Sequence, residues 1–170
     1  IVTTTSGCGG VIRDYGFQLG DEGAADVGRR TTDIIDLVAA HVPAEERPQN
    51  GIRVAWHRPC SQQHAMKTGD AGPALFRKLG FEVVEPADQD CCGSAGVYNV
   101  LQPRISEALQ ERKVEVLTAQ KPDLIVSGNI GCLAQIAGGT NVPVIHPVEV
   151  VDWAMGGPAP KAIAHLRMKH

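Results

Sequence analysis

The 170-residue sequence has little excess charge, with 16 lysine and arginine residues against 19 aspartate and glutamate residues. A net charge of -3 gives no electrostatic basis for binding nucleic acid, and no dense run of lysine and arginine predicts a polybasic membrane patch. Long apolar runs are also absent, so the sequence does not predict a membrane-spanning helix. We therefore expect peripheral membrane association at most, made through a partner.

The sequence also lacks a secretory signal, which would combine a basic start, an apolar middle and a small-residue cleavage site. Its five cysteines are an odd number, which argues against the disulfide framework of a secreted domain and favours a reduced, cytoplasmic setting. No glycine-rich stretch ends in Gly-Lys-Ser or Gly-Lys-Thr, so a phosphate-binding loop is not predicted. The first residue is Ile1 rather than methionine, and we interpret the chain as a fragment or a processed product.

Strand-like and helix-like segments alternate along the chain and are joined by short links. Apolar and β-branched runs predict five strands, at residues 1–5, 52–56, 81–84, 123–126 and 142–145. Apolar stripes at helical spacing predict helices between them, the longest at residues 21–42 and 104–120, the second with Ile105 and Leu117 on its inward face. This alternation predicts one α/β domain with a mainly parallel sheet and helices on both faces.

Every cysteine follows a predicted strand, and the five are Cys8, Cys60, Cys91, Cys92 and Cys132. Because the carboxyl ends of parallel strands share one edge of a sheet, we expect the cysteines on loops at that edge. Two adjacent thiols such as Cys91 and Cys92 rarely form a disulfide with each other, but both can bind one soft metal centre. The sequence therefore predicts a metal site that joins this pair to Cys60 and Cys132.

A weak internal repeat sets Cys8 apart. The strand-Ser-Gly-Cys arrangement of residues 1–8 resembles the strand-Ser-Gly-x-x-Gly-Cys arrangement of residues 123–132. We therefore interpret residues 1–20 as the tail of a preceding repeat, although Cys8 could also reach the same site. His57 is a further candidate for this site. It could replace one thiolate as a metal ligand, or donate a hydrogen bond to a sulfur of the metal centre. The alternative is that His57 has no part in the site and bonds a backbone carbonyl.

Three motifs together resemble a known family: His57-x-Pro59-Cys60, Cys91-Cys92-Gly93-Ser94-Ala95-Gly96 and Gly128-Asn129-Ile130-Gly131-Cys132. They resemble the CCG cysteine-rich domain of the heterodisulfide reductase type. More closely, the chain is similar to the C-terminal part of iron–sulfur subunits of the glycolate oxidase (glycolate dehydrogenase) type. The resemblance covers residues 1–157 and leaves a Gly/Pro-rich, basic tail at residues 158–170.

This resemblance implies an electron-transfer module that belongs to an oxidoreductase complex and is not catalytic alone. In that family, N-terminal ferredoxin-like cluster motifs precede two CCG modules, and the subunit relays electrons toward a quinone from FAD-containing subunits that oxidise glycolate to glyoxylate. No Cys-x-x-Cys-x-x-Cys run is present here, so the chain resembles the C-terminal module alone. The implied partners are the flavin subunits and the N-terminal remainder of the same subunit, at the cytoplasmic face of the inner membrane.

The resemblance also implies a [4Fe-4S] cluster, whose ligands would be Cys60, Cys91, Cys92 and Cys132. The wider pattern ends in Cys-x-x-Cys, whereas Asn129 stands at the first of those positions, and Thr5 stands at the equivalent place before Cys8. Asparagine and threonine are poor substitutes for a thiolate at iron. The alternative is a non-redox assembly module that has a structural zinc site with four cysteine ligands or binds no metal.

Overall fold

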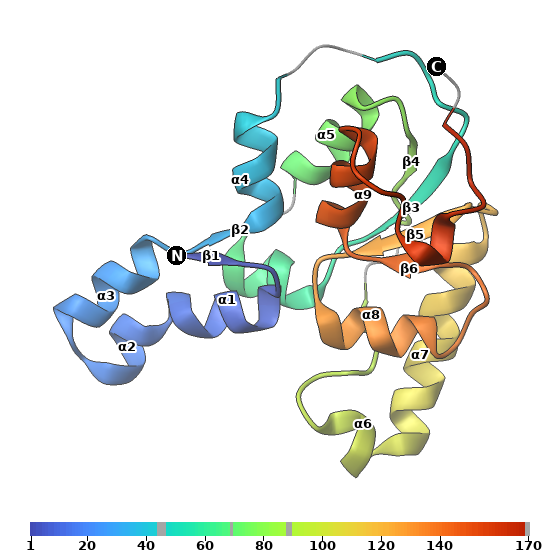
Figure 1. Cartoon of the computed structure of the whole chain (residues 1–170). Coiled ribbons are helices and arrows are strands. Elements are labelled where there is room, and N and C mark those ends of the chain that lie inside the picture. The colour runs from blue at the N-terminus through green and yellow to red at the C-terminus, as the bar shows by residue number, and fades with distance from the viewer. Residues whose placement is uncertain (44–46, 69, 88–89, 169–170) are drawn as a thin grey trace.

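A four-stranded parallel sheet lies at the centre of the computed structural model, which describes residues 1–43, 47–68, 70–87 and 90–168 (Figure 1). Its strands are β3 (Arg53–His57), β4 (Glu82–Val84), β5 (Leu124–Ser127) and β6 (Val144–Ile145). They lie in the order β4-β3-β5-β6, and each neighbouring pair runs parallel. The predicted α/β class with a mainly parallel sheet is confirmed.

Helices cover both faces of this sheet, as predicted (Figure 1). The covering helices are α4 (Ile34–His41), α5 (Ala71–Lys78), α7 (Pro103–Thr118), α8 (Ile130–Ala137) and α9 (Pro147–Ala154). Successive strand residues point to opposite faces. Val54 and Trp56 of β3 therefore pack with α4, α5 and α9, whereas Ala55 packs with α7 and α8. In the described part of the chain, none of the helices is long and apolar enough to cross a membrane.

The larger core contains a chain of four aromatic rings on the α4, α5 and α9 face. The ring centroids of Trp56 and Phe76 lie 5.1 Å apart in an edge-to-face arrangement. Phe81 lies 5.3 Å from Phe76, and Trp153 lies 6.5 Å from Phe81. These contacts join β3, α5 and α9, so they fix the sheet edge that carries the first cysteine loop.

The segment predicted as a C-terminal tail adds to this same core. Ile163, in the short 3-10 helix η2 (Lys161–Ile163), is fully buried among the core residues. Ala159, Leu166 and Met168 pack against the same cluster. Residues 158–168 therefore form part of the domain, and residues 169–170 lie outside the described part of the chain.

A second parallel sheet contains two strands, β1 (Val2–Thr3) and β2 (Thr32–Asp33). The single helix predicted at residues 21–42 is therefore wrong, because β2 separates α3 (Glu22–Arg29) from α4. The β-branched Thr31 and Thr32 disfavour a helix, and the Asp33 side chain caps α4 by accepting the Ile35 N–H at 2.9 Å. Helices α1 (Ser6–Arg13) and α2 (Tyr15–Leu19) precede α3 and form an arm with it (Figure 1).

The order β1, α1, β2, α4 repeats the order β5, α8, β6, α9. In each set a helix begins directly after the second strand, and the residue before that helix caps it. The Asp33 side chain accepts the N–H of Ile35, and His146 Nδ1 accepts the N–H of Val148 at 3.2 Å. The first set differs by the insertion of α2 and α3. The repeat seen in the sequence thus has a counterpart in the chain path.

Helix α7 matches its predicted range closely, and its inward face includes Leu117 as predicted but not Ile105. Ile105, predicted to face inward, is 51% exposed, whereas Ser106, Lys113 and Leu117 are buried. The Ser106 hydroxyl donates to the Gly93 carbonyl at 2.9 Å. The buried face of α7 is partly polar because it packs against the loop that carries two of the cysteines.

The carboxyl group of Asp33 allows a test of this local structure. Burial raises its pKa from 3.8 to about 6, and its Oδ2 has no hydrogen-bond partner among the described residues. Between these two pH values the Asp33 carboxyl is protonated in the folded protein but ionised in the unfolded chain. The stability that this carboxyl contributes is therefore lost as the pH rises through about 6. We expect Asp33→Asn, which keeps the capping oxygen, to raise the free energy of unfolding by about 1 kcal/mol near pH 7.5. Denaturant titrations should show no such gain near pH 4.5, and an equal gain at both pH values would contradict this explanation.

Candidate metal centre

All five cysteines line one cavity of about 370 Å³ at the carboxyl edge of the four-stranded sheet. Cys60 follows β3, the adjacent pair Cys91 and Cys92 follows β4, and Cys132 follows β5. Cys8 reaches the same cavity from the unit formed by β1 and α1. The structure therefore brings together the predicted set and the additional candidate.

Cys8 and Cys132 lie in the first turns of helices rather than on loops. Each is the third residue of its helix, α1 or α8, and each follows a glycine, Gly7 or Gly131. The first backbone N–H groups of a helix have no partner within it, and the helix dipole adds partial positive charge there. Because Gly7 and Gly131 also line the cavity, both helix starts favour negative charge inside it.

The adjacent pair Cys91 and Cys92 is positioned by a turn at Gly93. This glycine has a φ of +91°, and a Cβ added there would lie 2.6 Å from the carbonyl oxygen of Ser106. The Gly93 N–H donates to Cys91 Sγ at 3.4 Å, and Cys92 Sγ lies 3.1 Å from the hydroxyl oxygen of Ser94. Hydrogen bonds of this kind stabilise the thiolate form.

We expect Gly93→Ala to lower the free energy of unfolding by about 3 kcal/mol, because the left-handed backbone and the contact with Ser106 both oppose a side chain. Gly96 is a matched control, since it has a φ of +54° but no atom within 4 Å of an added Cβ. Gly96→Ala should cost only about 1 kcal/mol. Urea unfolding of both variants measures the difference, and equal losses would show that the close contact at Gly93 has no effect.

The thiol groups interact with one another. A hydrogen bond from Cys132 lowers the pKa of Cys92 to about 6, and the same hydrogen bond, together with burial, raises the pKa of Cys132. Burial, followed by the neighbouring Cys91 and Cys92, raises the pKa of Cys60. Simultaneous ionisation of these groups is therefore unfavourable unless a positive centre lies between them.

The cysteines surround a space rather than a point. As the side chains stand, no group of three His, Cys, Asp or Glu residues in the described ranges is arranged to hold a metal ion. A single zinc ion needs four ligands within about 2.3 Å of its centre. In a cubane iron–sulfur cluster each thiolate binds a different iron, so four thiolates surround a larger centre. The cysteine-lined cavity of about 370 Å³ offers the thiol groups that either kind of centre takes.

His57 lies inside the sheet and is not among the described residues that line the cavity. It is 1% exposed, and its Nδ1 lies 3.0 Å from the hydroxyl oxygen of Ser127 on the neighbouring strand. Burial, and then the charge of Lys113, lowers its pKa to about 3, so the ring is neutral near pH 7. The structure thus makes His57 the buried partner of a side chain rather than of a backbone carbonyl.

A polar cluster of Ser6, Ser61 and Asn129 beside the cysteines was not predicted. The Asn129 amide donates to the hydroxyl oxygens of Ser61 at 3.1 Å and Ser6 at 3.3 Å, and these hydroxyls lie 2.8 Å apart. Its Oδ1 caps α8 by accepting the Gly131 N–H at 3.0 Å. The residue that stands where the wider pattern has cysteine therefore ties together the segments after β1, β3 and β5. The only signal in the sequence was that each of the three lies near a cysteine.

Comparisons with known proteins agree with these motifs. The model of the CCG cysteine-rich domain family matches residues 54–137. The chain is 34% identical over 161 residues to the glycolate oxidase iron-sulfur subunit of Escherichia coli strain K12, an alignment that covers 91% of this chain and 40% of that protein. It is 25% identical over 165 residues to lactate utilization protein A of Oceanobacillus iheyensis, which covers 89% of this chain and 68% of that protein. It is 27% identical, with the same coverage, to lactate utilization protein A 1 of Bacillus anthracis.

The chain spans 40% of the length of the Escherichia coli relative, so it corresponds to a part of that protein. The matched residues 54–137 contain β3, β4 and β5 together with Cys60, the adjacent cysteine pair and Cys132. Cys8 lies outside this match, in the unit that we interpret as belonging to a preceding repeat. Residues 54–137 match the CCG cysteine-rich domain family, and these residues contain all three of the cysteine motifs.

Proposed function

We propose that this chain is an electron-transfer module of an iron–sulfur subunit, with a [4Fe-4S] cluster held by Cys60, Cys91, Cys92 and Cys132. The observation that carries this proposal is the convergence of cysteines from separate strands and helices around one cavity. Four thiolates are the ordinary ligand set of such a cluster. When bound, the cluster would supply one-electron transfer between a flavin and a second acceptor.

The chain's own groups would hold and tune that centre. The Gly93 N–H and the Ser94 hydroxyl lie within hydrogen-bond reach of the sulfurs of Cys91 and Cys92. Hydrogen bonds to the sulfurs and solvent exposure set the reduction potential of such centres. Cys8 is the most exposed of the thiols that line this cavity, and the proposal leaves it outside the ligand set.

The names of the relatives suggest the wider reaction. They are a subunit of glycolate oxidase and lactate utilization proteins, so a 2-hydroxy acid is the proposed substrate of the complex, with glycolate first. We place its oxidation to glyoxylate on separate FAD-containing subunits, with electrons passing through this chain toward a quinone. In this proposal the chain has no catalytic residue of its own.

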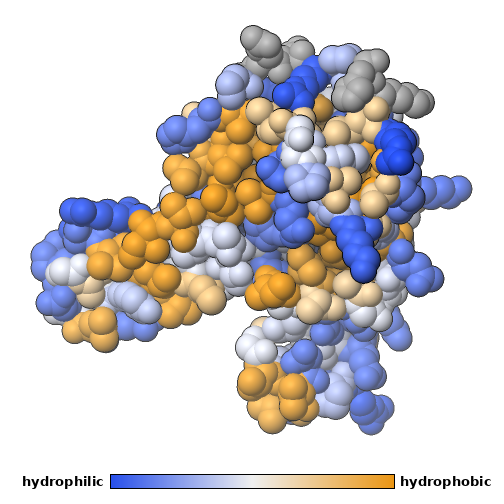
Figure 2. Space-filling model, in the orientation of Figure 1, coloured by the Kyte–Doolittle hydropathy of each residue, from blue (hydrophilic) through white to orange (hydrophobic). Residues whose placement is uncertain are grey.

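We also propose a position for the complex at the cytoplasmic face of the inner membrane. Figure 2 shows hydrophobic residues gathered over the arm of α1 to α3 and at the tip around α6 (Tyr98–Leu101). The exposed apolar residues there are Val11, Phe17, Leu19, Val97, Val100 and Leu101. Exposed apolar surface of this kind is typical of contacts with protein partners or a membrane surface.

In this proposal, residues 1–20 are the last part of a preceding repeat. The N-terminal part of the same subunit would supply the rest of that repeat, which is the first CCG module, and also the ferredoxin-like motifs. In the described structure β1 pairs with β2 alone, whereas its counterpart β5 lies between β3 and β6. Two-stranded sheets are marginal by themselves, and the exposed Ile1 and Val2 lie on this short strand unit. A strand equivalent to β3 beside β1 would complete the second sheet.

Metal and sulfide analysis of anaerobically prepared protein tests the proposed cluster. We expect a brown chain with about four iron and about four acid-labile sulfide ions, and an electron paramagnetic resonance signal after reduction. Colourless protein with one zinc ion would instead support the assembly module with a structural zinc site. Protein that binds neither metal under these conditions would support a docking module.

A further inference from the structure

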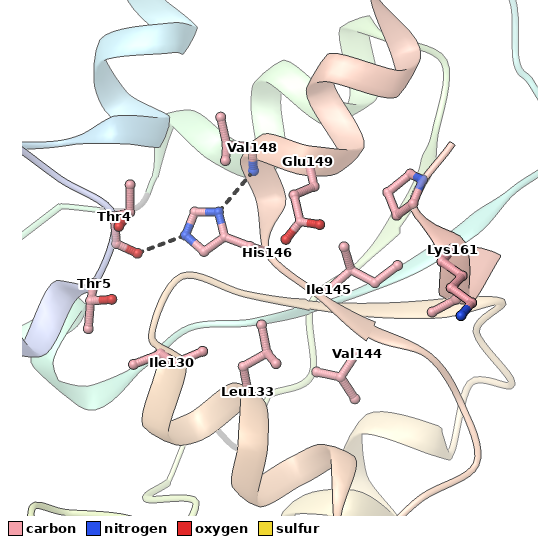
Figure 3. Close-up of a pocket in the computed structure, with 12 residues that line it drawn as sticks. Thr4, Thr5, Ile130, Leu133, Val144, Ile145, His146, Val148, Glu149 and Lys161 are labelled. Carbon is pink, nitrogen blue, oxygen red and sulfur yellow. Dashed lines mark hydrogen bonds between the residues drawn. The ribbon is translucent and has the colours of Figure 1, made fainter. Parts of the chain in front are cut away.

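A larger cavity, of about 680 Å³, shares Thr5 with the cavity that the cysteines line. Figure 3 shows the residues of this larger cavity. Its floor is aliphatic and is formed by Leu133 of α8 and Val144 of β6, and the more exposed Ile130 of α8 lies at the rim. The start of α9, with His146 and Glu149, faces this floor, and η2 closes one end (Figure 3). The volume falls within the range of about 300–1,000 Å³ that is typical of small-molecule sites.

The wall between the two cavities is thin. Thr5 lines both of them. Ile130 lines the larger cavity, while its sequence neighbours Asn129 and Gly131 line the cavity of the cysteines. Consecutive Cα atoms are only about 3.8 Å apart, so the wall is about one residue thick at this point. A molecule bound in the larger cavity would therefore lie beside the metal centre.

The lining has two chemical sides. Glu149, which is exposed, lies opposite the aliphatic floor, and the exposed Lys161 of η2 lies at one end of the cavity (Figure 3). His146 Nδ1 accepts the Val148 N–H, so its Nε2 carries the proton and donates to the Thr4 carbonyl at 2.9 Å. This arrangement holds the imidazole ring as a flat, neutral wall. The cavity suits a planar ring that has apolar faces and polar atoms at its edge.

We propose that this cavity binds the head group of a quinone, with the aliphatic floor against the ring and Lys161 and Glu149 beside its oxygens. Ile130 is 61% exposed at the rim, which gives an apolar exit for a lipophilic tail. The inference rests on the proposed electron-transfer function. A quinone takes up two electrons and two protons to become a hydroquinone. When bound, the proposed iron–sulfur centre would supply the two electrons one at a time, and the two protons would come from solvent through the carboxyl group of Glu149.

The test uses the full subunit assembled with its flavin partners. Leu133→Trp fills the floor of the cavity, and Ala137→Trp, an exposed position later on the same helix, is the matched control. Calorimetric titration with a short-chain naphthoquinone should show affinity weakened about tenfold or more in Leu133→Trp and unchanged in the control. Iron content and the paramagnetic signal of the cluster should be unchanged in both variants. Wild-type quinone affinity in a well-folded Leu133→Trp variant would overturn the proposal.

Two further variants decide the matter if Leu133→Trp does not fold. Lys161→Met should raise the KM for the quinone several-fold, and Glu149→Gln should lower the kcat of quinone reduction. Wild-type KM and kcat in both variants would overturn the quinone site. Failure of the electron-transfer function itself has a different signature, because Cys92→Ser would then leave iron content and quinone reduction unchanged.

Discussion

Replacement of Cys92 by serine is expected to remove the iron and acid-labile sulfide of this domain. Cys92 is 2% exposed and interacts with Cys132 across the cavity, so its sulfur lies on the inner side of the proposed ligand set. A serine hydroxyl does not ionise near neutral pH and is a hard ligand, whereas iron–sulfur clusters need thiolates. Electron transfer from the flavin subunits should fall about 100-fold or more, in line with the loss of a metal centre. Iron and sulfide analysis and paramagnetic resonance measure the effect.

Cys8→Ser is the matched control for this experiment. Cys8 lines the same cavity but is exposed and lies outside the four-cysteine set of the proposal. We expect this variant to keep its iron and sulfide. Assembly with the flavin subunits separates the remaining alternatives: an intact complex without electron transfer favours the redox function, while loss of assembly favours the structural module. Full iron content in Cys92→Ser would contradict the proposed ligand set.

Phe76→Ala is expected to lower the free energy of unfolding by about 3–5 kcal/mol. The Phe76 side chain is fully buried between the rings of Trp56 and Phe81. The space it leaves cannot close easily, because Trp56 is already fixed on its other side by Gly72, where an added Cβ would lie 2.3 Å from the Trp56 ring. Trp56 lies in the strand that leads to Cys60. The space left by the Phe76 ring should therefore also loosen the loop that carries Cys60. Urea unfolding and the iron retention of the variant measure these two effects.

Two controls bracket this result. Phe76→Leu keeps an apolar side chain in the same place and should cost about 1.5 kcal/mol. Phe17→Ala removes a ring that is 88% exposed, so its cost should stay within about 0.5 kcal/mol. If Phe76→Ala were no more destabilising than Phe17→Ala, the aromatic chain would not be the stabilising element of this core.

The central sheet and the gathering of cysteines could be predicted because both follow from local patterns. Buried parallel strands are apolar runs, and their carboxyl ends share one edge, so each cysteine after a strand was expected at that edge. The break in the helix at residues 21–42 could not be predicted in the same way. A strand as short as β2 depends on its pairing with β1, and this pairing joins residues about thirty positions apart along the chain.

The inward face of α7 and the second cavity were missed for related reasons. Apolar spacing placed Ile105 inside, but the helix instead buries Ser106, which bonds the loop at Gly93. The second cavity is built from residues 4–5, 130–149 and 160–162, and none of these segments has a local pattern that predicts a pocket. The polar cluster around Asn129 likewise depends on three segments that meet only in the folded chain.

The hydrogen bonds of Asn129 have a consequence for how the cysteines are placed. They join the segments after β1, β3 and β5 through one amide and two hydroxyl groups. Ser6, Ser61 and Asn129 lie close in sequence to Cys8, Cys60 and Cys132. A displacement of any one of these segments is therefore transmitted to the thiols of the other two.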